Sequence, residues 1–397
     1  MHGFHVTFAG KIVLAGLAAA SLIAVGLAQP RDERLVLEWP SRIDPSRSLQ
    51  DVVDEAAHGG VIRIRPGTHQ LEPIWIRNKD VSFEGGGTDG PGRTELVRPS
   101  PDARDPIPEA DAAIGTLNFI NAGIGVSRLR MRGGDAAIIG RVTADRARAG
   151  YTMNIANVAI SHAVRGIVWG SPGKIKVSDT KVTDVAWNGI AIAPPGGQSL
   201  FFDLHGINIF DFGNAAIVFV DNPGVCDDDH TVKNATIIGG GGPGILAVRS
   251  GVCVFDSHIA LTRGAGILAI SAAVLVQHSK IFFPTPLLDG RFGDGIVAVA
   301  GPGRSVVTVL DNEIKNVERV YISNFGSEVA FTGNELVCTD GFDLEATPWL
   351  GFPSTYSGPE FQCSDACPAQ LGLPPPSFKA CEAQSAGPPL APQMPFP

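Results

Sequence analysis

Acids, bases and amides recur along the middle of the chain at intervals close to one structural repeat, and these residues could do chemistry together. The candidate catalytic groups are Asp184, Asp211, Arg263, Arg291 and Asp294, and the candidate substrate-binding groups are Arg165, Trp187, Asn188 and Asn214. His162, Glu318 and Arg319 belong to the same pattern. Carboxylates two repeats apart, at roughly 10 Å, approach the separation that inverting glycoside hydrolases use.

A second reaction is open to the same residues. An arginine could neutralise the carboxylate of a uronic acid while a base removes the neighbouring proton, which is the chemistry of β-elimination. Trp187 offers an indole face on which a sugar ring could stack. A structural explanation is also open, because the turns of a repeat protein are polar where water solvates them and a tryptophan can fill a corner of the core.

The densest acidic run is Cys226-Asp227-Asp228-Asp229-His230. The three carboxylates of Asp227, Asp228 and Asp229 could supply oxygen ligands to Ca²⁺. Neighbouring side chains in an extended segment point in alternate directions, however, so a plain solvated turn is the alternative. Apart from this possible calcium site, the sequence predicts no cofactor.

A repeat provides the scaffold that could bring these residues to one surface. A small polar residue followed three positions later by an aliphatic one occurs at Asn157, Asp179, Asn234, Asp256, His278, Asp311 and, in degenerate form, Gly333. The successive spacings are 22, 55, 22, 22, 33 and 22 residues, and the gap of 55 contains an irregular coil near residues 200–209. Asn and Asp tolerate the left-handed conformation of tight turns, so the pattern predicts stacked coils of about 22 residues.

A Gly-Ile step, or its equivalent, runs in phase with this pattern and opens a short strand. The isoleucines are Ile167, Ile190, Ile217, Ile245, Ile267 and Ile296, which we expect to form one interior ladder. The next residues would then point outward, and all are apolar: Val168, Ala191, Val218, Leu246, Leu268 and Val297. An apolar outer face favours a covered surface or a nonionic partner.

The two patterns predict an all-β solenoid, a parallel β-helix whose body spans residues 114–340. Ser48 is expected to begin a helix with one apolar face, so residues 48–113 would form an N-terminal cap and the first coils. A linker over residues 29–47 would precede it. The Cys- and Pro-rich segment 341–383 would be a disulfide-stapled cap, followed by a flexible tail over residues 384–397.

Export is predicted from the first residues. Lys11 precedes an apolar run that ends at Ala28, which is typical of a signal peptide over residues 1–28 and implies a periplasmic or secreted protein. An uncleaved membrane anchor is the alternative. After cleavage, no other segment would be apolar enough to span a membrane. The mature chain would have 30 basic and 40 acidic residues, a net charge of −10. That balance argues against nucleic acid as a partner and repels anionic polymers unless a cation intervenes.

Six cysteines in an exported chain indicate disulfides. Six residues allow fifteen pairings, and we favour Cys226 with Cys253 because their separation of 27 residues is close to one coil.

The opening segments resemble those of the pectate lyase-like superfamily of right-handed parallel β-helices. The residues that carry the resemblance are Ser48 to Ala57, Gly59 to Ile64, Pro66 to His69 and Lys79 to Gly87. The superfamily mostly acts on polysaccharides, especially uronic acid polymers. Gly293 to Ile296 resembles one fragment of its glycosidase branch, but the Gly-His-Gly and Arg-Ile-Lys elements of that branch are missing here.

The resemblance therefore implies the fold without identifying a branch. We expect an exported protein that acts on a polysaccharide as a lyase or hydrolase, with an acidic glycan as substrate. The alternative is a non-catalytic module that binds a polysaccharide or serves as a structural part of the cell envelope. The sequence leaves the oligomeric state open.

Overall fold

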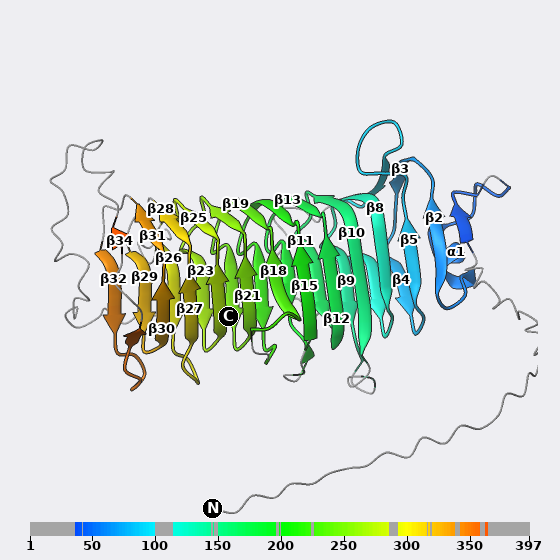
Figure 1. Ribbon diagram of the computed structural model, residues 1–397. Coiled ribbons are helices and arrows are strands. Elements are labelled where there is room, and N and C mark those ends of the chain that lie inside the picture. The colour runs from blue at the N-terminus through cyan, green and yellow to red at the C-terminus, as the bar shows by residue number, and fades with distance from the viewer. Residues whose placement is uncertain are drawn as a thin grey trace, which may run out of the picture. The chain divides into compact units, whose positions relative to one another are not determined.

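The chain folds into a right-handed parallel β-helix (Figure 1). The computed structural model describes residues 36–41, 43–99, 114–143, 146, 150–195, 198, 200–223, 226–285, 293–315, 317, 320–337, 342–357 and 362–363. Met1–Arg34 and Leu35–Pro397 are separate units, and every feature below belongs to the second. Among the described residues, no helix has the length and apolar character needed to cross a membrane. The predicted signal peptide lies outside them.

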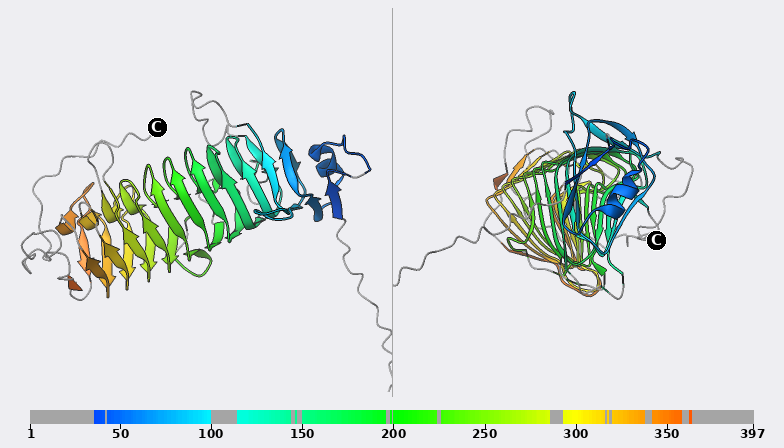
Figure 2. Two further views of the ribbon diagram at one scale, coloured as in Figure 1. Left: turned by 90° about the horizontal axis from the view of Figure 1, so that it is seen from above. Right: turned by 90° about the vertical axis from the view of Figure 1, so that its right-hand side faces the viewer.

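Three parallel ladders of strands make up the coils, and Figure 2 shows the stack from two further directions. The first ladder contains β1 (Val36–Trp39), β2 (Gly60–Ile64), β5 (Val81–Glu84), β8 (Ile124–Arg132), β10 (Tyr151–Ser161), β12 (Gly173–Ser178), β15 (Leu200–His205), β18 (His230–Lys233), β21 (Gly251–Phe255), β24 (Ala273–Gln277), β27 (Val306–Leu310), β30 (Glu328–Thr332) and β33 (Thr355–Ser357).

The second ladder shares the long strands β8 and β10 with the first. Its other strands are β3 (Gly67–Gln70), β6 (Thr94–Val97), β13 (Lys181–Val185), β16 (Asn208–Phe212), β19 (Thr236–Gly240), β22 (His258–Ala260), β25 (Lys280–Phe282), β28 (Glu313–Lys315), β31 (Glu335–Val337) and β34 (Gln362–Cys363).

The third ladder is a separate 11-stranded sheet. It contains β4 (Ile74–Arg77), β7 (Gly115–Ile120), β9 (Ala136–Arg141), β11 (Arg165–Gly170), β14 (Ile190–Ile192), β17 (Ile217–Val220), β20 (Ile245–Val248), β23 (Ala265–Ile270), β26 (Asp294–Val299), β29 (Val320–Phe325) and β32 (Phe342–Thr347).

The predicted isoleucine ladder is confirmed inside this third sheet. Ile167, Ile190, Ile217, Ile245, Ile267 and Ile296 pair in register on consecutive coils, and each is 0% exposed. The ladder continues to Ile138 on one side and Ile322 on the other. Because no single coil can bury its apolar side alone, this shared core is what makes the coils stack.

The predicted polar turn position is also confirmed. The turn between the first and second ladders, here called turn 1, has a left-handed residue in each regular coil: Arg128, Asn157, Asp179, Gly206, Asn234, Asp256, His278, Asp311 and Gly333. Gly206 fills the apparent gap of 55 residues, so that segment contains a regular coil with glycine at the turn. The turn between the second and third ladders is called turn 2 below.

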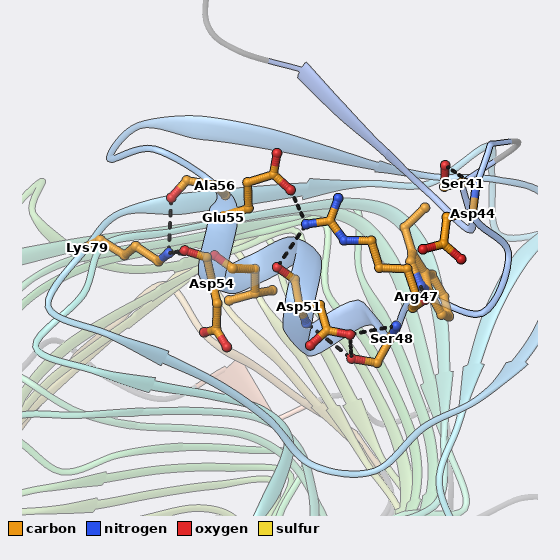
Figure 3. A network of polar contacts seen from close by, with 11 residues as sticks. Ser41, Asp44, Arg47, Ser48, Asp51, Asp54, Glu55, Ala56 and Lys79 are labelled. Atoms are coloured by element: carbon orange, nitrogen blue, oxygen red, sulfur yellow. Dashed lines mark hydrogen bonds and ion pairs between the residues drawn. The ribbon is translucent and has the colours of Figure 1, made fainter.

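The single helix among the described elements, α1 (Leu49–Glu55), begins where the sequence predicts, with Ser48 as its N-cap. Ser48 and Asp51 form a reciprocal capping box (Figure 3), and these hydrogen bonds hold the pKa of Asp51 below its ordinary value. Lys79 Nζ donates to the carbonyl oxygens of Asp54 and Ala56, both at 3.0 Å. The apolar face of α1 consists of buried Leu49, Val52 and Val53, and the helix contacts β4 and β1.

Two stretches differ from the expected organisation. Residues 36–39, expected in a linker, form β1, which pairs in parallel with β2. The ladders also continue past residue 341 through β32, β33 and β34. Residues 364–397, which include the last part of the expected cysteine-rich cap and the whole tail, lie outside the described part.

The predicted disulfide is confirmed. Cys226 and Cys253 are bonded, with a Cα–Cα distance of 5.1 Å. Cys253 lies on β21, which pairs with β18 just after Cys226, so the bond links adjacent coils.

Candidate functional site

Turn 2 places the left-handed residues of six consecutive coils in one line. In coil order they are His162, Asp184, Asp211, Gly239, Leu261 and Phe283, here called the turn 2 row. Adjacent coils of a parallel ladder stand about 4.8 Å apart, so neighbouring side chains in the row can touch. The row changes character along its length, from charged to glycine to apolar.

The charged half begins with a contact between His162 and Asp184. Nε2 of His162 lies 3.1 Å from Oδ2 of Asp184, and the two side chains are 53% and 64% exposed. Asp211 follows on the next coil and is also exposed. The two predicted acids are therefore one coil apart rather than two.

An open cavity of about 410 Å³ lies beside Asp211. Its lining residues are Val185, Asp211, Phe212, Gly213, Gly240, Gly241 and Arg263, and this cavity is called the glycine notch below. Asp211 and Arg263, both predicted as catalytic groups, come from coils on either side of the run Gly239–Gly242. They are two coils, or roughly 10 Å, apart along the stack.

The run Gly239–Gly242 creates the notch because it presents no side chains, and at Gly240, Gly241 and Gly242 the packing permits none. A Cβ atom on Gly240 would lie 2.1 Å from the ring of Phe212. A Cβ atom on Gly242 would lie 1.8 Å from the carbonyl oxygen of Asn214. The sequence places this run at a turn, but a cavity beside it could be found only once the coils were aligned.

Two charged residues among the predicted site residues are buried instead of facing a substrate. Arg165 is 4% exposed, and burial lowers the pKa of its guanidinium against the opposing effect of Asp135. Asp294 is 0% exposed and accepts a 2.8 Å hydrogen bond from Ser323 Oγ. Neither side chain is therefore placed to contact a polymer at the surface.

The predicted amides form their own contact across adjacent coils. Nδ2 of Asn214 donates to Oδ1 of Asn188 at 2.9 Å, and Asn188 is 8% exposed. Trp187 is half-buried, and its backbone carbonyl oxygen accepts a hydrogen bond from the backbone N–H of Asn214. Arg291, Glu318 and Arg319 lie outside the described residues.

The acidic run lies at a different corner, just before β18. Asp227 Oδ1 lies 2.6 Å from Nδ1 of His230, and this hydrogen bond lowers the pKa of Asp227. Asp229 lies 3.5 Å from Lys174 Nζ. In the part of the chain that the structure describes, no three His, Cys, Asp or Glu side chains are grouped so that they could hold a metal ion. Calcium binding by Asp227, Asp228 and Asp229 stays a prediction.

The outward face of the third ladder is apolar as predicted, and much of it is shielded from solvent. Val168 is 8% exposed and Val297 is 0% exposed. Val297 and Ile270 pack in one outer cluster with Ala265 and Val299, and partly buried Trp349 packs against it. This sheet therefore offers no open groove at Val297, and the exposed polar groups lie at turn 2.

The comparisons with known proteins support the fold. No protein-family model matches the sequence, and a comparison with curated proteins finds no match. The catalytic unit of a thermostable GH87 α-1,3-glucanase from Streptomyces thermodiastaticus strain HF3-3 is similar in structure, with a TM-score of 0.55 and 14% identity. The match covers 79% of this chain and 66% of that one.

Two further solved structures are similar. The catalytic domain of a GH87 α-1,3-glucanase in complex with nigerose has a TM-score of 0.51 and 14% identity, covering 82% of this chain and 68% of that one. A GH136 lacto-N-biosidase from Eubacterium ramulus has a TM-score of 0.50 and 11% identity, covering 83% and 67%. The shared feature is the parallel β-helix, and this chain spans about two thirds of each structure.

Proposed function

We propose that this protein binds a glycan across the glycine notch and hydrolyses it, with Asp184 and Asp211 as the carboxylate pair. The observation that carries the proposal is that one open cavity is lined by Asp211 and Arg263, with Asp184 on the adjacent coil. The fold shared with glycoside hydrolases supports it as an analogy.

The spacing of the carboxylates leads to a stereochemical expectation. Adjacent coils are about 4.8 Å apart, which is near the 5–5.5 Å that separates the two carboxyl groups of retaining hydrolases. One carboxylic acid would protonate the glycosidic oxygen while the other carboxylate attacks the anomeric carbon. Water would then release the sugar, with the first group acting as base, so the product would keep its anomeric configuration.

The charge of the site favours a neutral glycan over the acidic glycan expected from the sequence. Asp211 lines the notch with Arg263, and Asp184 lies on the coil beyond Asp211. A uronate chain would bring further carboxylates to a protein that already has a net negative charge. β-Elimination would in addition require a cation to neutralise the uronate carboxylate.

The decisive experiment incubates the purified protein with neutral and uronate polysaccharides, with and without calcium. We expect new reducing ends from a neutral glycan, and a loss of at least about a hundredfold in rate in both Asp184→Asn and Asp211→Asn. New absorbance from unsaturated sugars would instead support elimination. Full activity in both variants would contradict the assignment of the carboxylates.

A non-catalytic glycan-binding role is the second candidate. The shielded apolar face of the third ladder favours it, because the sheet that was expected to hold the site offers no open groove at Val297. Binding on a glycan array without turnover, weakened by Trp187→Ala, would support this role. Cleavage of the bound glycan would exclude it.

A further inference from the structure

Leu261 and Phe283 are exposed, bulky apolar residues in a backbone conformation that suits neither of them. Their φ angles are 54° and 51°, and they are 52% and 47% exposed. A bulky side chain in the left-handed region is an outlier, because its Cβ crowds the following carbonyl oxygen. Such strain persists where the surroundings impose it, and it concentrates at functional sites.

Turn 1 shows that the fold itself does not require these residues. The same coils have Asp256 and His278 at the left-handed position of turn 1. On neighbouring coils Asn234 and Gly206 occupy that position. Asparagine, aspartate or glycine would therefore satisfy the backbone in turn 2 as well. Packing does not explain the apolar side chains either, because about half of each lies in water.

The register places Leu261 and Phe283 beside the glycine notch. Leu261 follows Gly239 directly in register, and Phe283 follows Leu261. Arg263, which lines the glycine notch, lies two residues after Leu261 on the same coil. The apolar pair is therefore continuous with the notch on the side away from Asp184 and Asp211.

A glycan suits this sequence of surfaces. The faces of a pyranose ring that carry C–H groups are apolar and pack on aromatic and aliphatic side chains, while the ring hydroxyl groups remain solvated. The coil spacing of about 4.8 Å is close to the advance of one sugar unit in an extended chain. One ring could then lie on each coil.

We propose that Leu261 and Phe283 are sugar-stacking subsites, so that a glycan chain runs along the turn 2 row, parallel to the stack of coils, from Phe283 across the notch to Asp184. This inference rests on the proposed function and adds the direction of the chain and the location of its binding surface. It predicts a substrate long enough to span several coils.

The test measures affinity and melting temperature together. The full chain is titrated by calorimetry with soluble α-1,3-gluco-, β-1,4-gluco- and galacturono-oligosaccharides. Phe283→Asn should weaken the binding of the best ligand about tenfold or more, and Leu261→Asn should weaken it by a smaller factor. Phe283→Trp should keep the affinity of the wild type or raise it, because tryptophan offers a larger ring. The melting temperature of the Asn variants should stay within about 2 °C of wild type or rise, because relief of backbone strain offsets the lost packing.

Two control variants match these changes. His278→Asn makes the same kind of change in turn 1, and Phe201→Ala removes an aromatic side chain that is 42% exposed on the first ladder. Both should leave affinity unchanged.

Three outcomes would overturn the inference. If the wild type binds a glycan and Phe283→Asn binds it equally well, the stacking inference is wrong. The proposed function would still stand if Asp211→Asn abolishes cleavage. A concentration-dependent dimer in sedimentation that Phe283→Asn abolishes would show that a second copy occupies the pair. Absence of binding by the wild type to every oligosaccharide would overturn the proposed function together with it.

Discussion

Turn 1 and turn 2 share a left-handed backbone conformation but carry different kinds of side chain at it. In turn 1 the left-handed positions carry Asn, Asp, His, Gly and one Arg, which are residues that adopt this conformation at little cost or extend into water. In turn 2 the row passes from His and Asp through glycine to Leu and Phe. The two rows lie on the same coils, so the fold imposes the same demand on both. The demands of the backbone therefore do not explain the departure in turn 2.

The comparison depends on the register of the coils, and a charge in the core would test it most severely. Ile245→Asp should lower the free energy of unfolding by about 4 kcal/mol, because it places an unpaired carboxylate at a fully buried position. Leu246→Asp, on the outward and partly buried side of the same strand, should cost about half as much, roughly 2 kcal/mol. Denaturant unfolding measures both, and equal costs would contradict the register.

Substitution of a glycine should lower the free energy of unfolding more in turn 2 than in turn 1. Gly242→Ala should cost about 2 kcal/mol, because the new Cβ would lie 1.8 Å from the carbonyl oxygen of Asn214. Gly206→Asn in turn 1 should change stability by less than about 0.5 kcal/mol, since the nearest atom to its Cβ is a side-chain oxygen of Asp179. A larger cost in turn 1 would reverse the contrast.

Within turn 1, substitution between accepted residue types should be almost silent. Asn234→Asp should change the free energy of unfolding by less than about 0.5 kcal/mol, because Asp256 holds the same position on the next coil. Thermal unfolding at neutral pH measures it. A cost above about 2 kcal/mol would mean that the turn 1 row is more specific than its composition indicates.

The smallest expected effect concerns pH at His258, which lies between the two rows on one coil. Burial, and then the charge of Lys280, lower the pKa of His258 in the folded state. The unfolded chain therefore takes up the proton first. The stability that neutral His258 contributes is complete above the pKa of the unfolded chain, about 6.5, and is lost as the pH falls through the lower pKa of His258 in the folded state. His258→Gln should remove this part of the pH dependence, and a steeper loss in the variant would contradict the assignment.

Much of the fold could be predicted because the ladders repeat visibly in the sequence. Ile245 and its equivalents follow glycine at nearly constant spacing, and Cys226 and Cys253 lie about one coil apart. The coil around Gly206 was expected to be irregular because glycine replaces the polar residue that marks the others. β1 was missed because a short strand before a helix has no repeat to align with.

The site was predicted only in part. Asp211 and Arg263 share a cavity, whereas Arg165 and Asp294 are buried, and a repeat pattern does not reveal which polar residues at a turn are buried. Leu261 and Phe283 were missed because residue preferences argue against apolar side chains at left-handed turns. The available clue was alignment, since each follows an aliphatic strand at the position that Asp184 and Asp211 occupy.

The run Gly239–Gly242 occupies one coil between Asp211 and Arg263, so the distance between these two residues is set by a whole number of coils. A solenoid can lengthen or shorten the distance between Asp211 and Arg263 only by inserting or deleting an entire turn of chain, a step of about 4.8 Å. Finer adjustment must come from the reach of the side chains at the two edges, a short carboxylate on one and a long guanidinium on the other. Adaptation to a new ligand would therefore proceed by discrete jumps in spacing, with exchanges of side-chain length between them.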